Sequence, residues 1–338
     1  MIFQGEPGPD DVEFDRALRP DSFDEFVGQG AIRENLHIAI EAAKRRDEPL
    51  DHVLFAGPPG LGKTTLSHLI AASMGTELVV TSGPALGAPK DLAGTLSRLR
   101  RGDVLFVDEI HRLPRSVEEY LYSAMEDSAI DVVLDQGGPT GRSVRIRLEP
   151  FTLVGATTRE GLLSGAFRSR FGMVERLEVY PTDEIHEIIA RASVRLAFPI
   201  DDDAAALIAS RSRGVPRVAL RIQRRIRDLA QVRDADRVDF ATAEEGLGRL
   251  RIDELGLEDM DRRLLRALIE RGEPTGLKTL PALVDESEDT LCEVFEPHLL
   301  RCGLIDRTPR GRVATSRARA HLGIGPASPN DGELPFEA

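Results

Sequence analysis

Tryptophan is absent from this chain of 338 residues, and cysteine occurs only twice, at Cys292 and Cys302. If one helix carried both cysteines, a rise of about 1.5 Å per residue would separate them by about 15 Å. That separation is too long for a disulfide bond. Neither cysteine belongs to a metal-binding sequence motif. The two thiols therefore predict neither a disulfide framework nor a metal centre.

Long apolar runs and a basic leader are also missing. No apolar run approaches the roughly 20 residues that span a bilayer, and the start of the chain lacks the basic and apolar segments of a secretory signal. The net charge of −13 argues against a surface coated in phosphate-binding groups. With 41% apolar and 30% charged residues, we expect a globular, cytoplasmic protein of two or three domains.

The first half of the chain has the pattern of an α/β domain. After acidic, aperiodic residues 1–15, which predict a mobile tail, an amphipathic helix is predicted over 26–45. Short apolar runs then alternate with helical patterns, at 52–56, 78–81, 103–107, 151–156 and 174–180. Runs of this kind are typical of strands that are buried on both faces, which favours a parallel sheet covered by helices.

The second half predicts two smaller domains. After Pro181 the pattern is helical, over 182–197, 203–213, 216–233 and 240–250. From Asp253 onward come a helix and two shorter ones, at 277–285 and 287–302, and then two short strands within 304–314. Three helices followed by a hairpin outline a winged helix. We therefore predict an ATPase domain over 1–180, a helical lid domain over 181–252 and a winged-helix domain over 253–338.

One segment carries the strongest chemical signal. Gly57-Pro58-Pro59-Gly60-Leu61-Gly62-Lys63-Thr64 matches G-x-x-x-x-G-K-[ST] and lies between a predicted strand and a predicted helix, as a Walker A loop must. Its backbone N–H groups would surround the phosphates of ATP, with Lys63 on the β- and γ-phosphates and the Thr64 hydroxyl on Mg²⁺. The alternative is a strand-to-helix turn with incidental glycines and prolines.

A pair of acidic residues completes the predicted site. Asp108 and Glu109 follow the apolar run Val104–Val107, 45 residues after Lys63. We expect Asp108 to hold Mg²⁺ through water and Glu109 to orient and deprotonate the attacking water. Such a run with two acids is weak evidence alone, but together with a Walker loop it predicts an ATP hydrolase.

Several motifs give the chain a more specific resemblance. Asp108–His111 and Gly155–Thr158 resemble the Walker B and sensor-one elements of AAA+ ATPases. Further segments, in order from about Leu18 to Leu322, resemble the RuvB family, the bacterial motors of Holliday junction branch migration. These are Leu18–Pro20, Phe26–Gln29, Leu50–His52, Thr81–Pro84, Ala124–Asp127 and Arg307–Arg312. The last of them lies outside the AAA+ core, so a shared core alone would not reproduce it.

The resemblance implies a role for particular residues. Thr158 would be sensor one, Arg170 an arginine finger inserted into the site of a neighbouring subunit, and Arg217 sensor two. With Lys63, Asp108 and Glu109 these form the predicted catalytic set. The implied nucleotide contacts are Leu18, Arg19, Gly57, Gly60, Leu61, Gly62, Lys63, Thr64, Thr65, Glu126, Asp127, Ser128, Arg170, Tyr180 and Arg217. Thr64 and Asp108 would be the Mg²⁺ ligands.

The resemblance also implies partners. A predicted hairpin over Asp131–Leu148 would dock a RuvA-like junction-binding protein, a RuvC-like resolvase would join a larger complex, and the chain would form a homohexameric ring. Duplex DNA at Holliday junctions would contact Arg307, Arg310 and Arg312 on the wing, where an ordinary solvated basic face is the alternative. The chain departs from the family pattern at Ser128, at Ala166 and at Pro281, which interrupts the predicted helix over 277–285.

The predicted function is therefore an ATP-driven motor that moves duplex DNA in recombination and DNA repair. One rival is a clamp-loader or other switch ATPase, which shares every ATP motif but does not explain the predicted wing. Another is a DNA-binding regulator with a gating ATPase. Such a regulator needs a helix that reads bases, and the segment 287–302 is too acidic to enter a major groove readily.

Overall fold

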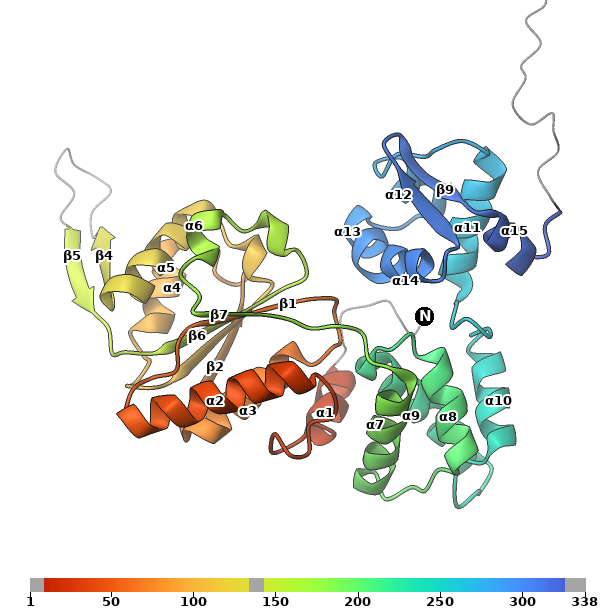
Figure 1. Cartoon of the computed structure of the whole chain (residues 1–338), viewed down its shortest axis with the longest axis horizontal. Coiled ribbons are helices and arrows are strands. Elements are labelled where there is room, and N and C mark those ends of the chain that lie inside the picture. The colour runs from red at the N-terminus through yellow and green to blue at the C-terminus, as the bar shows by residue number, and fades with distance from the viewer. Residues whose placement is uncertain (1–8, 134–142, 326–338) are drawn as a thin grey trace, which may run out of the picture. The chain divides into compact units, whose positions relative to one another are not determined.

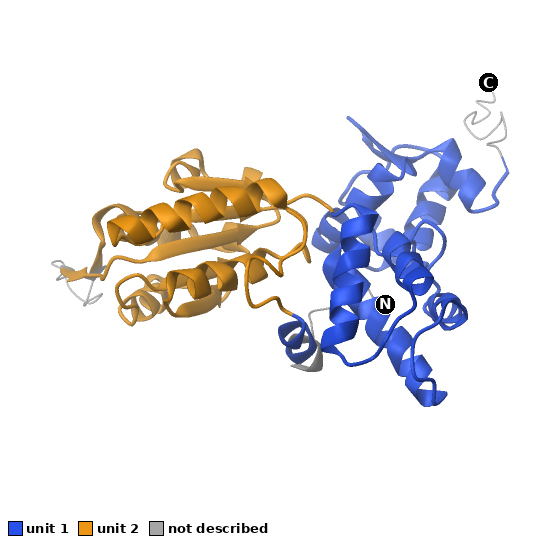
Figure 2. Ribbon diagram, turned by 60° about the horizontal axis from the view of Figure 1, so that its bottom comes forward, with its two compact units in different colours: residues 1–18, 180–338 blue, residues 19–179 orange. Residues whose placement is uncertain are grey.

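The computed structural model describes residues 9–133 and 143–325. The chain divides into two compact units (Figure 2), one of residues 19–179 and the other of residues 1–18 together with 180–338. Residues 19–179, drawn in orange as unit 2 in Figure 2 and called the first unit here, hold the predicted parallel sheet. The second holds the predicted helical and winged-helix segments.

A five-stranded parallel sheet forms the centre of the first unit (Figure 1), in the order β2-β3-β6-β1-β7. Its strands are β1 Val53–Ala56, β2 Leu78–Ser82, β3 Val104–Asp108, β6 Thr152–Thr157 and β7 Met173–Arg176. All five predicted strands are confirmed. The three central strands β1, β3 and β6 are almost wholly buried, whereas the edge strands β2 and β7 are partly exposed. This difference follows from helices covering both faces of the sheet.

Helices of the first unit connect these strands. They are α2 Gly30–Arg46, α3 Lys63–Met74, α4 Pro89–Leu96, α5 Arg115–Asp127 and α6 Gly165–Arg168, with short 3₁₀ turns at Ile110–Arg112 and Glu160–Leu162. Helix α2 buries Ile32, Leu36, Ile40 and Ala43, as predicted. It begins at Gly30 rather than Phe26 because Gly28 and Gln29 both have positive φ angles, which a right-handed helix does not allow.

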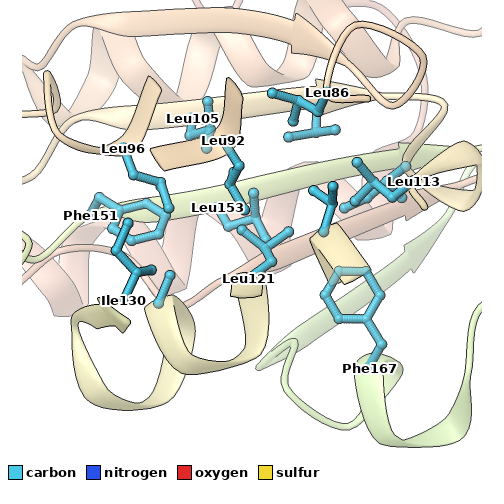
Figure 3. Close-up of a cluster of buried hydrophobic side chains, with 14 of the residues drawn as sticks. Leu86, Leu92, Leu96, Leu105, Leu113, Leu121, Ile130, Phe151, Leu153 and Phe167 are labelled. Carbon is cyan, nitrogen blue, oxygen red and sulfur yellow. The ribbon is translucent and has the colours of Figure 1, made fainter. Parts of the chain in front are cut away.

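A large apolar cluster on one side of the sheet fixes α4 and α5 in place (Figure 3). Leu92 and Leu96 of α4 and Leu121 of α5 point toward Leu105 of β3 and Leu153 of β6. Each of these leucines is at least 98% buried, and burying one such side chain contributes about 1.5–3 kcal/mol. The cluster therefore makes α5 a rigid support for the residues that it carries.

The predicted hairpin forms a separate two-stranded sheet of β4 Ala129–Val133 and β5 Ser143–Arg147. The pairing is antiparallel, with Asp131 opposite Arg145. The turn of the predicted hairpin lies outside the described residues. Leu148 is buried and Ile146 packs on the apolar cluster, while Val144 is exposed beside the arginines. Strand β5 therefore does not divide cleanly into a buried apolar face and an exposed arginine face.

The N-terminal segment differs from the sequence prediction. Where a tail is predicted over residues 1–15, helix α1 spans Pro9–Ala17. The Phe14 ring lies 4.7 Å from the guanidinium carbon of Arg224, in a cation–π contact. Local periodicity gives no sign of this helix, because its partners lie about two hundred residues further along the chain.

Four helices follow the sheet and form the predicted lid segment. They are α7 Thr182–Arg195, α8 Asp202–Arg211, α9 Pro216–Val232 and α10 Phe240–Arg249. All four are predicted from helical spacing, and each buries one apolar face. Pro216 stands in the first turn of α9, where a missing N–H costs nothing.

The C-terminal segment has the outline of a winged helix. Its elements are α11 Asp259–Arg271, α12 Leu280–Val284, α13 Glu288–Thr290, a π-helical turn over Leu291–Phe295, α14 Glu296–Arg301, the strands β8 Ile305–Thr308 and β9 Gly311–Ala314, and α15 Ser316–His321. The predicted helix over 277–285 is shorter in the structure, because α12 begins only at Leu280, with Pro281 in its first turn. The two cysteines are free thiols. Within the described ranges, no helix has the length and apolar character to cross a membrane.

Candidate active site

The loop between β1 and α3 has the backbone geometry of a phosphate-binding loop. Gly57, Gly60 and Gly62 have φ angles of 141°, 81° and 103°, which other residues rarely adopt. At Gly57, a Cβ atom would lie 2.6 Å from the carbonyl oxygen of Leu177. The glycines therefore let the chain turn tightly into α3, where backbone N–H groups at the helix N-terminus can converge on an anion.

Lys63 is the first residue of α3 and is only 7% exposed. Its Nζ donates hydrogen bonds to the carbonyl oxygens of Gly57, at 2.7 Å, and Pro58, at 2.8 Å. A phosphate oxygen beside this ammonium would form a charge-assisted hydrogen bond with it. Leu61 is buried beside the loop and Thr65 follows in α3. The environment of Lys63 fits the predicted β- and γ-phosphates.

The carboxyl edge of the sheet holds four of the six predicted catalytic residues, which are Lys63, Asp108, Glu109 and Thr158. Strands β1 and β3 both pair with β6, and the N–H of Gly57 donates to the carbonyl oxygen of Thr157 at 3.0 Å. Asp108 is the last residue of β3 and Thr157 the last of β6. Open parallel sheets bind their ligands at this edge, so the Walker loop, the acidic pair and the predicted sensor share one site.

Backbone contacts fix the acidic pair. Asp108 Oδ1 accepts the N–H of Glu109 at 2.9 Å, and the N–H of Gly83 donates to the carbonyl oxygen of Asp108 at 2.7 Å. A Cβ at Gly83 would collide with the Glu109 carbonyl. Glu109 has a φ of 47°, and its carboxylate pairs with Arg112 at 2.7 Å. A positive φ at a residue other than glycine is a strained conformation that is often found at functional sites.

Two adjacent threonines at the end of β6, Thr157 and Thr158, have different surroundings. Thr157 Oγ1 lies 3.0 Å from His111 Nδ1 and accepts the N–H of Arg159 at 3.0 Å. Thr158 Oγ1 is buried and has no hydrogen-bond partner in the described part of the chain. A buried hydroxyl without a partner is costly, so Thr158 fits a contact with a bound phosphate or water. Sequence reasoning gave no role to His111, which links the Walker B turn to β6.

The donors predicted for Mg²⁺ come from two of these elements. Thr64 is the second residue of α3, and Asp108 ends β3. Across residues 9–133 and 143–325, no group of three or more His, Cys, Asp or Glu side chains could hold a metal. Mg²⁺ in nucleotide sites commonly uses one or two protein oxygens together with phosphates and water. A hydroxyl and a carboxylate beside a phosphate-binding loop fit that chemistry.

Arg170, the predicted arginine finger, lies just beyond α6 with its side chain 22% exposed. One guanidinium nitrogen pairs with Glu126 at 2.9 Å, and another donates to the carbonyl oxygen of Ala166. The guanidinium carbon is 4.5 Å from the centre of the Tyr122 ring. The structure thus places Glu126, which the resemblance assigns to the nucleotide pocket, with the finger itself.

Asp127 and Ser128, which follow Glu126, connect α5 to the hairpin. Asp127 pairs with Arg145 of β5 at 2.9 Å. Ser128 has a φ of 48° and accepts the N–H of Leu148 through its carbonyl oxygen at 2.8 Å. The backbone of Ser128 reverses the chain at the end of α5, so a change of its side chain leaves this backbone contact in place.

The remaining predicted nucleotide contacts belong mainly to the other unit. Tyr180 is buried, and its N–H donates to a carbonyl oxygen of the loop before α9 at 2.9 Å. Arg217 is the second residue of α9 and pairs with Asp15 of α1 at 3.4 Å. Leu18 directly follows α1, and Arg19 begins the first unit. Helix α1 therefore lies beside the arginine that is predicted to be sensor two.

The three arginines that are predicted to contact DNA lie on the wing, the hairpin of β8 and β9, and they differ in exposure. Arg307 and Arg312 face each other across the β8–β9 pair, and both pair with the buried carboxylate of Glu296, at 2.6 Å and 2.8 Å. Their side chains are 56% and 18% exposed. Arg310 lies in the turn between the strands and is exposed. Arg310 and Arg307 are thus accessible to a phosphate, whereas Arg312 is mostly covered.

Electrostatics explain why Glu296 can be buried. Burial raises the pKa of its carboxyl, but hydrogen bonds from Arg312 and Arg307 outweigh burial and lower the pKa below its usual value. A buried charge is tolerated when charged partners of this kind surround it. Arg312, and in part Arg307, therefore stabilises the wing, and the sequence pattern does not predict this role.

Three family models match the chain in succession. They are described as the Holliday junction DNA helicase RuvB P-loop domain, over residues 18–177, the RuvB AAA lid domain, over 180–253, and the RuvB C-terminal winged helix domain, over 254–323. Together the matches extend over nearly the whole described chain.

Comparison with individual known proteins leads to the same family. The chain is 55% identical over 311 residues to a Holliday junction branch migration complex subunit RuvB of Kosmotoga olearia, covering 91% of each chain. It is 51% identical over 329 residues to the corresponding subunit of Prosthecochloris aestuarii, covering 96% of this chain and 95% of that one. A solved structure of the Thermotoga maritima RuvB Holliday junction branch migration motor has a TM-score of 0.84 at 49% identity, with 92% of this chain and 100% of that chain covered.

Proposed function

This chain belongs to the RuvB family, and we propose that it hydrolyses ATP to move duplex DNA and so drives branch migration of Holliday junctions. One observation carries the proposal. The Walker loop, the acidic pair and Thr158 lie at one edge of the sheet in a chain whose P-loop, lid and winged-helix segments each match a RuvB model. A clamp-loader or other switch ATPase would account for the first two segments but not for the third.

The chemistry at the sheet edge follows from the contacts of its residues. Lys63 and the N–H groups of the loop bind the phosphates, and we propose that Thr64 and Asp108 hold Mg²⁺. When bound, Mg²⁺ offsets negative charge on the phosphate oxygens. Glu109 orients the attacking water and accepts its proton, and Thr158, whose buried hydroxyl has no hydrogen-bond partner among the described residues, contacts the γ-phosphate or that water.

Arg170 supplies the remaining charge from a neighbouring subunit. An arginine finger of this kind stabilises the transition state of phosphoryl transfer, and its loss costs about 10³–10⁵ in turnover. Because Glu126 pairs with Arg170, we propose that Glu126 and the following Asp127 and Ser128 approach the nucleotide of that neighbouring subunit. A finger that acts in trans requires an oligomer, and we propose a homohexameric ring.

The second unit is proposed to report on the nucleotide and to contact DNA. Leu18 and Tyr180 would contact the nucleotide, with Arg217 as sensor two. Arg310 and Arg307 would pair with phosphates and Arg312 would support the wing. Phosphate contacts carry no sequence information, and a motor that moves along any duplex needs none.

The partners follow from the same family membership. We propose that a RuvA-like junction-binding protein docks on the hairpin of β4 and β5 and that a RuvC-like resolvase joins the larger complex. Because the substrate is chromosomal DNA, we propose a cytoplasmic location.

Mixed rings test the trans site on which the proposed ring motor depends. Arg170→Ala subunits keep an intact hydrolysis site but lack the finger, whereas Glu109→Gln subunits keep the finger but lack the base. Each variant alone should hydrolyse ATP very slowly, and mixing them should raise turnover above the sum of the two. With mixed assembly confirmed by co-purification of differently tagged subunits, no gain would place the finger in its own subunit or outside the site.

A further inference from the structure

We propose that Tyr122 is a positioning residue for the arginine finger, because its ring lies against the Arg170 guanidinium and a hydrogen-bonded network fixes it there. The proposal rests on the function proposed above, in which Arg170 acts on the nucleotide of a neighbouring subunit. Neither sequence motifs nor the predicted site residues assign a role to Tyr122.

The contact between the two side chains is direct. The Arg170 guanidinium carbon lies 4.5 Å from the centre of the Tyr122 ring, within the distance at which a cation is attracted to an aromatic face. Glu126 and the Ala166 carbonyl oxygen hold the two terminal guanidinium nitrogens. An arginine side chain has many rotamers, so a fixed ring surface lowers the cost of presenting the guanidinium in one of them.

The ring of Tyr122 is itself fixed at both ends. Its hydroxyl contacts the Glu118 carboxylate, one turn earlier on α5, and lies 2.9 Å from Ser164 Oγ. Its ring centre is 5.3 Å from that of Phe167, which is wholly buried in the apolar cluster. Burial and the hydrogen bond to Glu118 raise the pKa of the Tyr122 hydroxyl, so the hydroxyl stays protonated and donates a hydrogen bond to the carboxylate.

Ser164 connects this network to the segment that carries the finger. Its Oγ accepts the N–H of Phe167 at 3.1 Å and so caps the N-terminus of α6. The same hydroxyl donates to Glu118 at 2.7 Å. Helix α6 ends two residues before Arg170. Helix α5 therefore holds the finger at two points, through Ser164 at the start of α6 and through Tyr122 at the guanidinium.

Substitutions at position 122 separate the ring from the hydroxyl. Tyr122→Phe keeps the ring and should retain most of the ATP turnover, whereas Tyr122→Leu removes the aromatic face. From the usual strength of a cation–π contact, Tyr122→Leu should lower turnover about three- to thirty-fold. Tyr122→Met fills a similar volume with a flexible apolar chain and replaces the leucine variant if that variant does not fold. Tyr120→Leu is the matched control, since Tyr120 lies on the same helix and is also partly buried against the apolar cluster.

Mixed rings distinguish a finger defect from a general one. The hydrolysis site of a Tyr122→Leu subunit is intact, so mixing with Glu109→Gln subunits, which supply a normal finger, should raise turnover above the sum of the two. Tyr120→Leu should retain its turnover per folded subunit and show no such gain. A Tyr122→Leu protein with normal turnover, or one whose defect also appears in Tyr120→Leu, would overturn the inference.

The same assay separates this inference from the function on which it rests. If Arg170→Ala is complemented by Glu109→Gln but Tyr122→Leu is not, the finger acts in trans and Tyr122 does not position it. If Arg170→Ala is not complemented either, the trans finger itself is wrong, and the role of Tyr122 is overturned with it.

Discussion

The Arg213 guanidinium forms a buried ion pair with the Asp261 carboxylate, and the two side chains are 3% and 0% exposed. Arg213 lies in the loop between α8 and α9, and Asp261 lies in the first turn of α11. The Arg213 Nε also donates to the carbonyl oxygen of Gly256 at 2.8 Å, and the Arg213 carbonyl oxygen accepts from Arg301 of α14 at 3.0 Å. These contacts join the lid to the winged helix.

Because this ion pair joins them, we expect the lid and the winged helix to lose stability together when it is broken. Asp261→Asn leaves the Arg213 charge buried without its partner, which typically costs about 3–5 kcal/mol. Hydrogen exchange should therefore accelerate in both α9 and α11. The control Glu187→Gln breaks an exposed pair with Arg191 and should change stability by less than about 1 kcal/mol. Faster exchange in only one of the two helices would mean that the pair does not couple them.

A glycine comparison tests the geometry of the phosphate-binding loop. Gly57→Ala should abolish nucleotide binding, because its Cβ would lie 2.6 Å from the Leu177 carbonyl oxygen at a φ of 141°. Gly75 also has a positive φ, of 72°, but a Cβ there meets nothing within 4 Å. Gly75→Ala should cost about 1–2 kcal/mol of stability, because an L-residue is disfavoured at that φ, and should leave binding of a fluorescent ATP analogue unchanged. Equal binding by both variants would show that the loop tolerates a side chain.

Arg310→Ala should weaken DNA binding without loss of stability, whereas Arg312→Ala should lower stability. Arg310→Ala removes an exposed turn residue, so DNA affinity should fall and its salt dependence should weaken by about one counterion, with no change in melting temperature. Arg312→Ala removes one partner of the buried Glu296 and should lower stability by about 1–3 kcal/mol. DNA-binding titrations at several salt concentrations and thermal melts measure the two effects. A stable Arg312→Ala protein with weakened DNA binding would assign Arg312 to the DNA.

The buried side chain of His298 should make the stability of the winged helix depend on pH. Burial lowers its pKa to about 3, with the charge of Arg213 acting in the same direction. The folded protein thus keeps His298 neutral while the unfolded chain protonates it near its ordinary value of 6.5. The stability from neutral His298 is complete above pH 6.5 and is lost as the pH falls toward 3, which amounts to about 2 kcal/mol at pH 5.

The matched variant for this effect is His298→Gln, which keeps a donor for the Leu255 carbonyl oxygen that His298 contacts at 2.9 Å. Denaturant unfolding of the winged helix at pH 7 and pH 5 should show a smaller loss for His298→Gln than for the natural chain. Identical losses in the two proteins would remove His298 from the acid response.

The sequence predicts the parts of this molecule that depend on local pattern. The five strands and the loop at Lys63 follow from apolar runs and glycine spacing, which neighbouring residues determine. The helix at Pro9–Ala17 and the pairing of Arg312 with Glu296 depend on residues that meet only in the folded chain. The same holds for Tyr122, whose ring has no motif of its own and gains its place through contacts with α6.

A four-way-junction migration assay tests the central claim most directly. Labelled junction DNA is incubated with the chain, a RuvA-like protein and ATP, and Glu109→Gln serves as the control that binds ATP without hydrolysing it. The account predicts ATP-dependent conversion of the junction to duplex products by the natural chain and none by Glu109→Gln. Rapid ATP turnover on junction DNA by the natural chain without any branch migration would contradict it.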